Sequence, residues 1–251
     1  MAEAPPLPDT SSPPWLRESL GDATGRGVRV AVIDSGRDAD WQDPRFLSGL
    51  GLVAEKGFQL QESNDDDDRL GHGTACSDLL LGMAPGIEIL PIRVFGERLE
   101  TSPQILVHAI DRAVDEGCGL INLSLGTLLE DAATDLYRAC ERARQAGVLV
   151  VAAVHRHAGW SYPAAFDHVL GVQAGRFDNI WTFEYLPEEA GECKAQGDRE
   201  VRWLAGERRR ALAPSFAAPH LTALVARLRE QRPDLDADGV RTFLQSISTT
   251  T

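Results

Sequence analysis

Short apolar runs alternate along this chain with longer stretches in which apolar residues recur every three or four positions. The runs are of strand length and end at glycine or polar residues, so they predict buried strands at 28–33, 88–94, 120–123, 148–153 and 169–173. The longer stretches predict helices at 72–81, 102–116, 131–145, 215–231 and 236–246.

Strands that alternate with helices predict an α/β fold of three layers, with a mainly parallel sheet and helices on both of its faces. Binding sites of such sheets form at the carboxyl ends of the strands. That rule directs attention to the segments that follow Ile33, Leu123 and Ala153.

In two parts of the chain, apolar and polar residues follow no clear helical or strand spacing. Residues 1–14 are rich in Pro, Ser and Ala, and we predict a partly disordered N-terminal arm over 1–24. Residues 176–212 contain Trp181, Trp203 and the basic run 208–210, and a lid, a dimer contact and a partner site are all open interpretations there.

Composition narrows the class of protein. The net charge of −13 argues against a nucleic-acid partner, because phosphates require Lys and Arg. The sequence shows no membrane-length apolar run and no signal-peptide pattern at its start. The four cysteines are well separated without a CxxC pair, which argues against a zinc cluster. We therefore predict a cytoplasmic chain with reduced thiols.

Asp34, His72 and Ser215 lie in the segments that carry candidate chemistry: VAVIDSG, LGHGTACS and APSFAAPH. Each residue alone has an ordinary explanation, as a turn residue, a helix entry and a helix N-cap. Together they offer a carboxylate, a base that titrates near neutral pH and a hydroxyl nucleophile. The set predicts acyl transfer, in which the carboxylate orients the histidine that activates the serine.

The sequence resembles the subtilisin family from about residue 25 to residue 228. The resemblance rests on VAVIDSG, DDDDRLGHGTACS, LLLGMAPGIEILPIRVF, INLSLG and PSFAAPH, which follow in the family's order. It implies a subtilisin-like peptidase domain over 25–251 and a serine endopeptidase with Asp34, His72 and Ser215 as the catalytic residues. It also implies that Ser124, Leu125 and Gly126 bind an extended peptide substrate, with no cofactor.

The chain departs from the family pattern in its oxyanion site. The family supplies an Asn where VVAAVHRHAG has His155, so we assign the imidazole N–H of His155 as the second oxyanion donor. Ala213 and Pro214 replace the usual Gly-Thr before the serine. His155 and His157 form an HxH pair, which by itself is a weak metal signal, and no metal site is predicted.

Two further features of the triad segments are open to interpretation. Cys76 falls one helical turn after His72, which predicts a buried thiol below the histidine, open to mercurials. The acidic run 65–68 either favours a basic substrate residue or is a solvated loop or weak cation site.

Several functions are compatible with these residues. The main interpretation is an endopeptidase of restricted range, such as a protease that matures a peptide or one partner protein. A peptide-binding pseudoprotease is the alternative, motivated by His155, Ala213 and Pro214. A peptide ligase or cyclase would share the acyl-enzyme. A partner protein or a homo-oligomer is left open.

Overall fold

A nine-stranded sheet forms the middle layer of the computed structural model, which describes residues 12–54 and 60–248. The order across the sheet is β3-β2-β4-β1-β5-β6-β7-β9-β8. The strands are β1 (Arg29–Asp34), β2 (Leu50–Ala54), β3 (Leu60–Ser63), β4 (Glu88–Arg93), β5 (Leu120–Leu123), β6 (Leu149–Ala153), β7 (Val169–Gly175), β8 (Phe183–Tyr185) and β9 (Cys193–Gln196).

The strands of this sheet run parallel except at its two edges, where β3 and β8 pair antiparallel with β2 and β9. In the centre, Ile33 of β1 pairs with Leu123 of β5, which in turn pairs with Ala152 of β6. The carboxyl ends of these three strands therefore meet at one edge of the sheet, as the sequence predicts.

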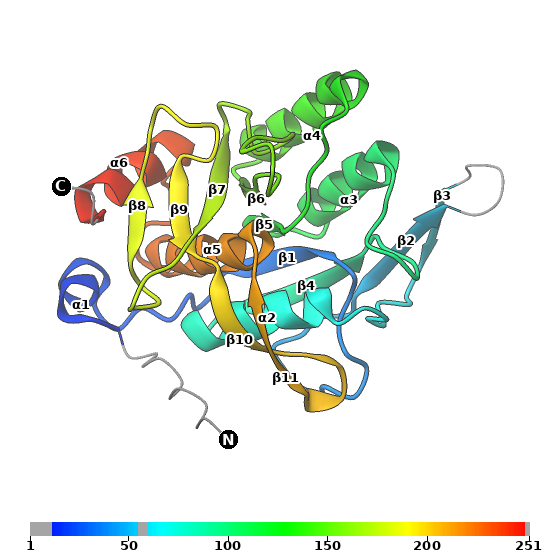
Figure 1. The fold of residues 1–251 in the computed structure, drawn as a ribbon, viewed down its shortest axis with the longest axis horizontal. Coiled ribbons are helices and arrows are strands. Elements are labelled where there is room, and N and C mark those ends of the chain that lie inside the picture. Colours follow the sequence, from blue (N-terminus) through cyan, green and yellow to red (C-terminus); the bar gives the residue numbers. More distant parts are fainter. Residues whose placement is uncertain (1–11, 55–59, 249–251) are drawn as a thin grey trace.

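Helices cover both faces (Figure 1). They are α1 (Pro14–Leu20), α2 (His72–Met83), α3 (Pro103–Asp115), α4 (Ala133–Gln145), α5 (Pro214–Gln231) and α6 (Ala237–Ile247). One apolar core joins the sheet to α1, α2, α5 and α6, and the other joins it to α3 and α4. Each core excludes water from a whole sheet face, which is the main stabilising contribution for such layers. The predicted three-layer α/β fold is confirmed.

The region that lacked a period, 176–212, forms β8, β9 and a hairpin of β10 (Asp198–Arg202) and β11 (Arg208–Leu212). The hairpin stands apart from the main sheet and packs on α2 (Figure 1). Its β11 strand carries the basic run and is almost wholly exposed, so no alternation of apolar and polar residues marks it.

Part of the expected N-terminal arm is packed. Residues 14–20 form α1, whose Leu16 and Leu20 are buried in the core beside α5 and α6. The two leucines are four positions apart and so lie on one helix face. Residues 1–11 of the expected arm lie outside the described residues.

The structure bears on two expectations, that the thiols are reduced and that the chain has no membrane-spanning segment. All four cysteines are free and buried. Across residues 12–54 and 60–248, the structure has no helix long and apolar enough to cross a membrane.

Candidate active site

Asp34 ends β1, at the edge of the sheet where the parallel strands β1, β5 and β6 finish. Its side chain is fully buried. The Oδ1 atom accepts hydrogen bonds from the Ser35 backbone N–H at 2.7 Å and from His72 Nδ1 at 2.7 Å. These bonds fix the carboxylate, and they require that Nδ1 of His72 carries a proton.

His72 is the first residue of α2, and two glycines make its position possible. Gly71 has a φ of 82°, and a Cβ there would meet the ring of Trp203. A Cβ on Gly73 would meet the backbone of Gly36 in the turn after β1. The helix can therefore start against the Asp34 turn only if both neighbours of His72 lack side chains.

One member of the acidic run 65–68 serves this helix start. Asp68 is buried and accepts hydrogen bonds from the N–H groups of Leu70, Gly71 and Thr74. A carboxylate at a helix N-terminus is favourable because it satisfies free N–H groups and the positive end of the dipole.

Two other members of the run are also held by the protein. Asp66 pairs with Arg37 at 3.4 Å, and Asp65 pairs with Arg93 at 2.8 Å. The interpretation of the run as a solvated loop is therefore wrong for the buried Asp66 and Asp68, and none of the four lines the cleft described below.

The His72 imidazole is almost completely buried, and its remaining exposure is about 11 % of the side chain. Burial acts to lower the pKa of His72, but the adjacent Asp34 carboxylate outweighs it, and the pKa lies well above 6.5. The pair therefore favours an imidazolium beside a carboxylate, the charge arrangement that forms when histidine takes a proton from serine.

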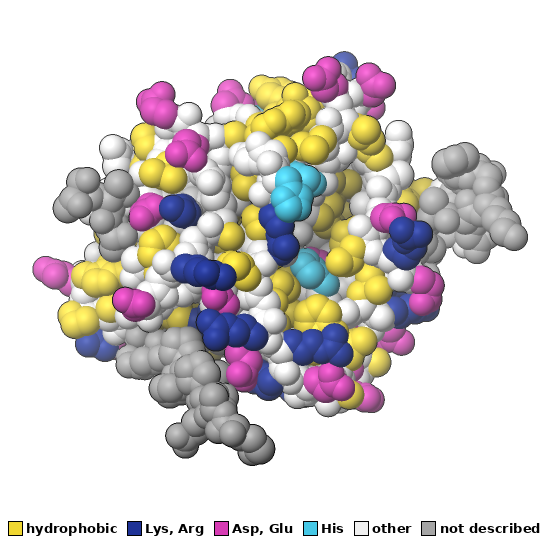
Figure 2. All heavy atoms as spheres, viewed as in Figure 1, with side chains coloured by type: hydrophobic (Ala, Val, Ile, Leu, Met, Phe, Trp, Pro, Cys, Tyr) yellow, Lys and Arg dark blue, Asp and Glu magenta, His cyan; other side chains and the backbone are white. Residues whose placement is uncertain are grey.

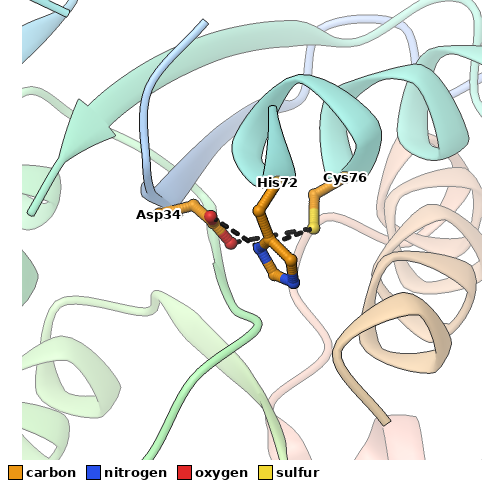
Figure 3. A group of neighbouring side chains, drawn as sticks. All are labelled: Asp34, His72 and Cys76. Atoms are coloured by element: carbon orange, nitrogen blue, oxygen red, sulfur yellow. Dashed lines mark hydrogen bonds and ion pairs between the residues drawn. The ribbon is translucent and has the colours of Figure 1, made fainter. Parts of the chain in front are cut away.

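Cys76 lies one turn after His72, where the helical spacing predicted it (Figure 3). Its Sγ lies 4.0 Å from His72 Nδ1, 3.7 Å from Asp34 Oδ2 and 3.3 Å from Ser124 Oγ. Burial, together with the charge of Asp34, raises the pKa of the thiol. Cys76 is therefore a neutral side chain that packs below the His72–Asp34 pair.

Asp34, His72 and Cys76 are also the one group, within the described part of the chain, whose ligand atoms lie close enough to hold a metal ion, within 4.8 Å of one another. The donor set does not fit a resident cation well. His72 Nδ1 already carries a proton for Asp34, and the thiol is protonated, so a cation would have to displace both protons. We derive no step through a metal.

Ser215 lies at the second position of α5, after Ala213 as the N-cap and Pro214 as the first residue. Proline suits that position because its missing N–H would have had no partner in the helix. The Ser215 N–H is one of the first N–H groups of the helix, which have no acceptor within it. The residue therefore presents a hydroxyl and a backbone donor at the positive end of an 18-residue helix.

The carbonyl of Ser215 also lacks its usual helical partner, because the residue four positions on is Pro219, which has no N–H. The Cys76 thiol lies 3.7 Å from this carbonyl. Cys76 thus touches backbone or side-chain atoms of the predicted carboxylate, base and nucleophile alike.

A cleft of about 410 Å³ brings the predicted residues together. His72, Ser215, His155, Ser124, Leu125 and Gly126 all line it. Asp34 is the predicted site residue that does not line the cleft, since it lies behind His72. A larger hollow of about 690 Å³ lies between α3 and α4 and contains none of these residues.

Ser215 and His72 share the cleft, but in the described part of the chain no hydrogen bond joins the serine hydroxyl to the histidine. Such bonds are often long in enzymes without substrate and tighten in the complex.

Leu125 and Gly126 form an open backbone edge beside the serine. Within residues 12–54 and 60–248, neither has a backbone hydrogen-bond partner, whereas Thr127 pairs antiparallel with Tyr162. A Cβ on Gly126 would meet Ser161 and Tyr162, so glycine allows the two segments to close on each other. Free N–H and C=O groups of this kind can pair with an extended peptide.

His155 is exposed near the start of the segment that follows β6, and it lines the cleft. Its Nδ1 accepts a hydrogen bond of 3.4 Å from the His157 backbone N–H. In the neutral ring, the proton is therefore on Nε2, which is free to donate.

The sequence motifs do not include a series of hydrogen-bonded, buried polar side chains behind the site. Thr222 of α5 donates to Asn122 Oδ1 at 2.9 Å, and Asn122 Nδ2 donates to Ser124 Oγ at 3.0 Å. Asn122 stands in the middle of the apolar strand β5, and a polar residue there was the available signal. These hydrogen bonds link β5 and the segment after it to α5, the helix that carries Ser215.

Comparison with known proteins agrees with this geometry. The chain is 27 % identical to Subtilisin DY of Bacillus licheniformis over 242 residues, which cover 90 % of this chain and 85 % of that protein. It is 24 % identical to an intracellular serine protease of Paenibacillus polymyxa, covering 82 % of this chain and 68 % of the relative. Other matched bacterial proteases are longer, and the chain spans 63 %, 33 % and 60 % of three of them.

A solved structure supports the same fold. The crystal structure of a cold adapted subtilisin-like serine proteinase superposes with a TM-score of 0.72 at 20 % identity, covering 90 % of this chain and 83 % of the other. Residues 25–179 match the subtilase family. That match covers more than half of the sequence, and with the fold it establishes that the chain is a member of the subtilase family.

Proposed function

We propose that this chain is a serine endopeptidase that cleaves peptide bonds through an acyl-enzyme on Ser215. His72 Nε2 takes the proton of the Ser215 hydroxyl as Oγ bonds to the substrate carbonyl carbon. The Ser215 N–H and the His155 imidazole stabilise the resulting oxyanion. His72 then gives its proton to the leaving amine, and water attacks the ester by the same route in reverse.

One observation carries the proposal: a buried His72–Asp34 pair at 2.7 Å faces a cleft that also contains Ser215 at a helix N-terminus. The pair holds the histidine in the tautomer that leaves Nε2 able to accept a proton. The helix start supplies a donor for the developing negative charge.

Labelling with a fluorophosphonate, read by intact mass, tests the proposal directly. We expect the native chain to gain one adduct at Ser215 and the Ser215→Ala variant to gain none. The missing His72–Ser215 hydrogen bond is the observation that favours a pseudoprotease that only binds peptides. A native chain that stays unlabelled would support that second function.

We infer that the substrate range is restricted. Leu99 and Leu129 line the cleft and expose 54 % and 60 % of their surfaces, and Phe95, Leu106 and Leu125 line it as well. This apolar wall would select apolar side chains at substrate positions that precede the residue whose carbonyl is attacked. The likeness to an intracellular serine protease supports a processing role in the cytoplasm. The masses of the products would separate hydrolysis from ligation or cyclisation.

We expect kcat/KM to rise with pH, with a midpoint above pH 6.5. The reason is that Asp34 raises the pKa of His72, and only the neutral imidazole can act as the base. The raised pKa also stabilises the fold: this contribution is complete below about pH 6.5 and is lost as pH rises through the folded-state pKa. A pH–rate profile on a peptide ester checks the first point, and a midpoint below 6.5 would contradict it.

We expect His155→Ala to lower kcat by about 100- to 1000-fold with little change in KM, because an oxyanion donor acts mainly in the transition state. His157→Ala is the matched control: it removes the neighbouring ring but leaves the backbone N–H that bonds His155. An equal loss in both variants would show that His155 only shapes the loop.

A further inference from the structure

The catalytic cleft has an unusual distribution of charge. Its ionisable lining residues are His72, Glu100, His155 and Arg156. Glu100 forms an ion pair with Arg98 at 2.8 Å. Arg156 is exposed, and within residues 12–54 and 60–248 no carboxylate lies within ion-pair distance of it. The cleft of a chain with a net charge of −13 thus contains an unpaired cation.

The three arginines of β11, the strand that Arg156 contacts, are each paired, whereas Arg199 and Arg202 of β10 form no ion pair within the described residues. On the β10–β11 hairpin, Arg208 pairs with Asp78 at 2.8 Å, Arg209 with Glu207 at 2.8 Å and Arg210 with Asp198 at 2.9 Å. Figure 2 shows Lys and Arg side chains gathered over this hairpin and beside the histidines in the middle of the face. Arg156 makes one contact instead, from a guanidinium N–H to the Leu212 carbonyl at 2.6 Å.

That contact positions the guanidinium without neutralising it. A guanidinium has five N–H donors in a rigid fork, so most of them are left for another acceptor. Leu212 ends β11, just before the segment that leads to Ser215. The guanidinium is therefore anchored to the strand that precedes the proposed nucleophile, and it stays in the cleft.

The two walls of the cleft determine what meets Arg156. Ser124 to Thr127 follow β5, and Val154 to Arg156 follow the adjacent strand β6. A peptide that pairs with the free edge at Leu125 and Gly126, with its carbonyl between Ser215 and His155, must direct a side chain into the space between these walls. That side chain belongs to the residue whose carbonyl is attacked, called P1. Thr127, which also lines the cleft, pairs antiparallel with Tyr162.

We propose that Arg156 determines specificity by selecting an acidic P1 residue, so that the substrates are peptides cleaved after Glu or Asp. This inference rests on the proposed peptidase function and narrows its substrate class. A carboxylate there would form charge-assisted hydrogen bonds with the free N–H groups of the guanidinium. A basic P1 residue would meet a like charge, which is the opposite of what the acidic run 65–68 suggested.

Phosphonate probes test the proposal without knowledge of the natural substrate. Ala-Ala-Pro-X diphenyl phosphonates, with X as the analogue of Glu, Gln or Lys, differ only at P1 and modify an active serine. We expect the native chain to react about 10- to 100-fold faster with the Glu probe than with the Gln probe, and slowest with the Lys probe. Raising the salt concentration should reduce the preference for Glu.

Two variants separate charge from structure. Arg156→Gln keeps an N–H donor for the Leu212 carbonyl and should react equally with the Glu and Gln probes. Arg156→Glu should prefer the Lys probe. Arg144→Gln removes the same charge from an exposed ion pair on α4 and should behave as the native chain.

The outcomes also separate this inference from the proposed function. A small fluorophosphonate has no P1 side chain and reports only on the serine. If it labels Ser215 but the three probes react alike, or if Arg156→Gln keeps the preference, the acidic specificity is wrong and the peptidase function stands. If the fluorophosphonate does not label the native chain, the peptidase function falls and the inference falls with it.

Discussion

Replacing Ser215 with alanine is expected to lower kcat for peptide hydrolysis by about 10⁶-fold, the size of loss that triad removal causes in subtilisin. The hydroxyl is the only atom of this residue that can form the acyl bond. The His72→Ala variant should lose nearly as much, because among the described residues that line the cleft His72 is the one base held by a carboxylate.

The double variant provides the sharper measurement. If Ser215 and His72 act as one unit, Ser215→Ala with His72→Ala should be no slower than either single variant, since each change alone removes the same pathway. If the losses multiply, the two residues work independently and the acyl-enzyme mechanism is wrong. Thermal unfolding of all three variants controls for the buried position of His72.

The Asp34→Asn variant is expected to lose about 10⁴-fold in kcat while its fold is kept. An amide in this position can turn its NH₂ group toward His72 Nδ1, which then becomes the acceptor. The ring proton moves to Nε2, and His72 can no longer take a proton from Ser215. The loss should therefore appear in kcat and in fluorophosphonate labelling much more than in peptide binding.

Asp38→Asn is the matched control for this change. Asp38 is also a buried aspartate on the segment that follows β1, and its Oδ1 accepts from the Asp40 N–H and not from the histidine. An equal loss of kcat in the two variants would mean that Asp34, like Asp38, contributes to folding and has no specific role toward His72. NMR of the His72 ring nitrogens would report the tautomer in each case.

The central sheet and the main helices could be predicted because their patterns are local. The run 120–123 is β5 as predicted, and Ser102 accepts from the Ile105 N–H as the cap of α3. The edge strands were missed for a physical reason. β3 is exposed at every residue and so shows no alternation, whereas β8 alternates over only three residues, too few to predict a strand.

The site was predictable to the extent that it lies within motifs. Motifs singled out Asp34, His72 and Ser215, and within residues 12–54 and 60–248 the Asp34–His72 contact is the one hydrogen bond among these three side chains. Arg156 was missed because its importance depends on the lack of an ion-pair partner among the described residues. Ion pairs between segments far apart in the sequence cannot be predicted from adjacent residues. The role of Asp68 was missed for the same reason, because the N–H groups that donate to its carboxylate belong to a helix start that only the fold defines.

The position of Ser215 on α5, the helix that packs against α2, has a consequence for how the protein is made. Asp34 and His72 emerge from the ribosome early, but roughly 140 residues separate His72 from Ser215, which is about 7 to 30 s of synthesis at usual rates. Until α5 has emerged and docked, the nascent chain holds a base without a nucleophile. On the proposed function, an unfinished chain therefore cannot cut itself, because the serine arrives when most of the sheet has already been made.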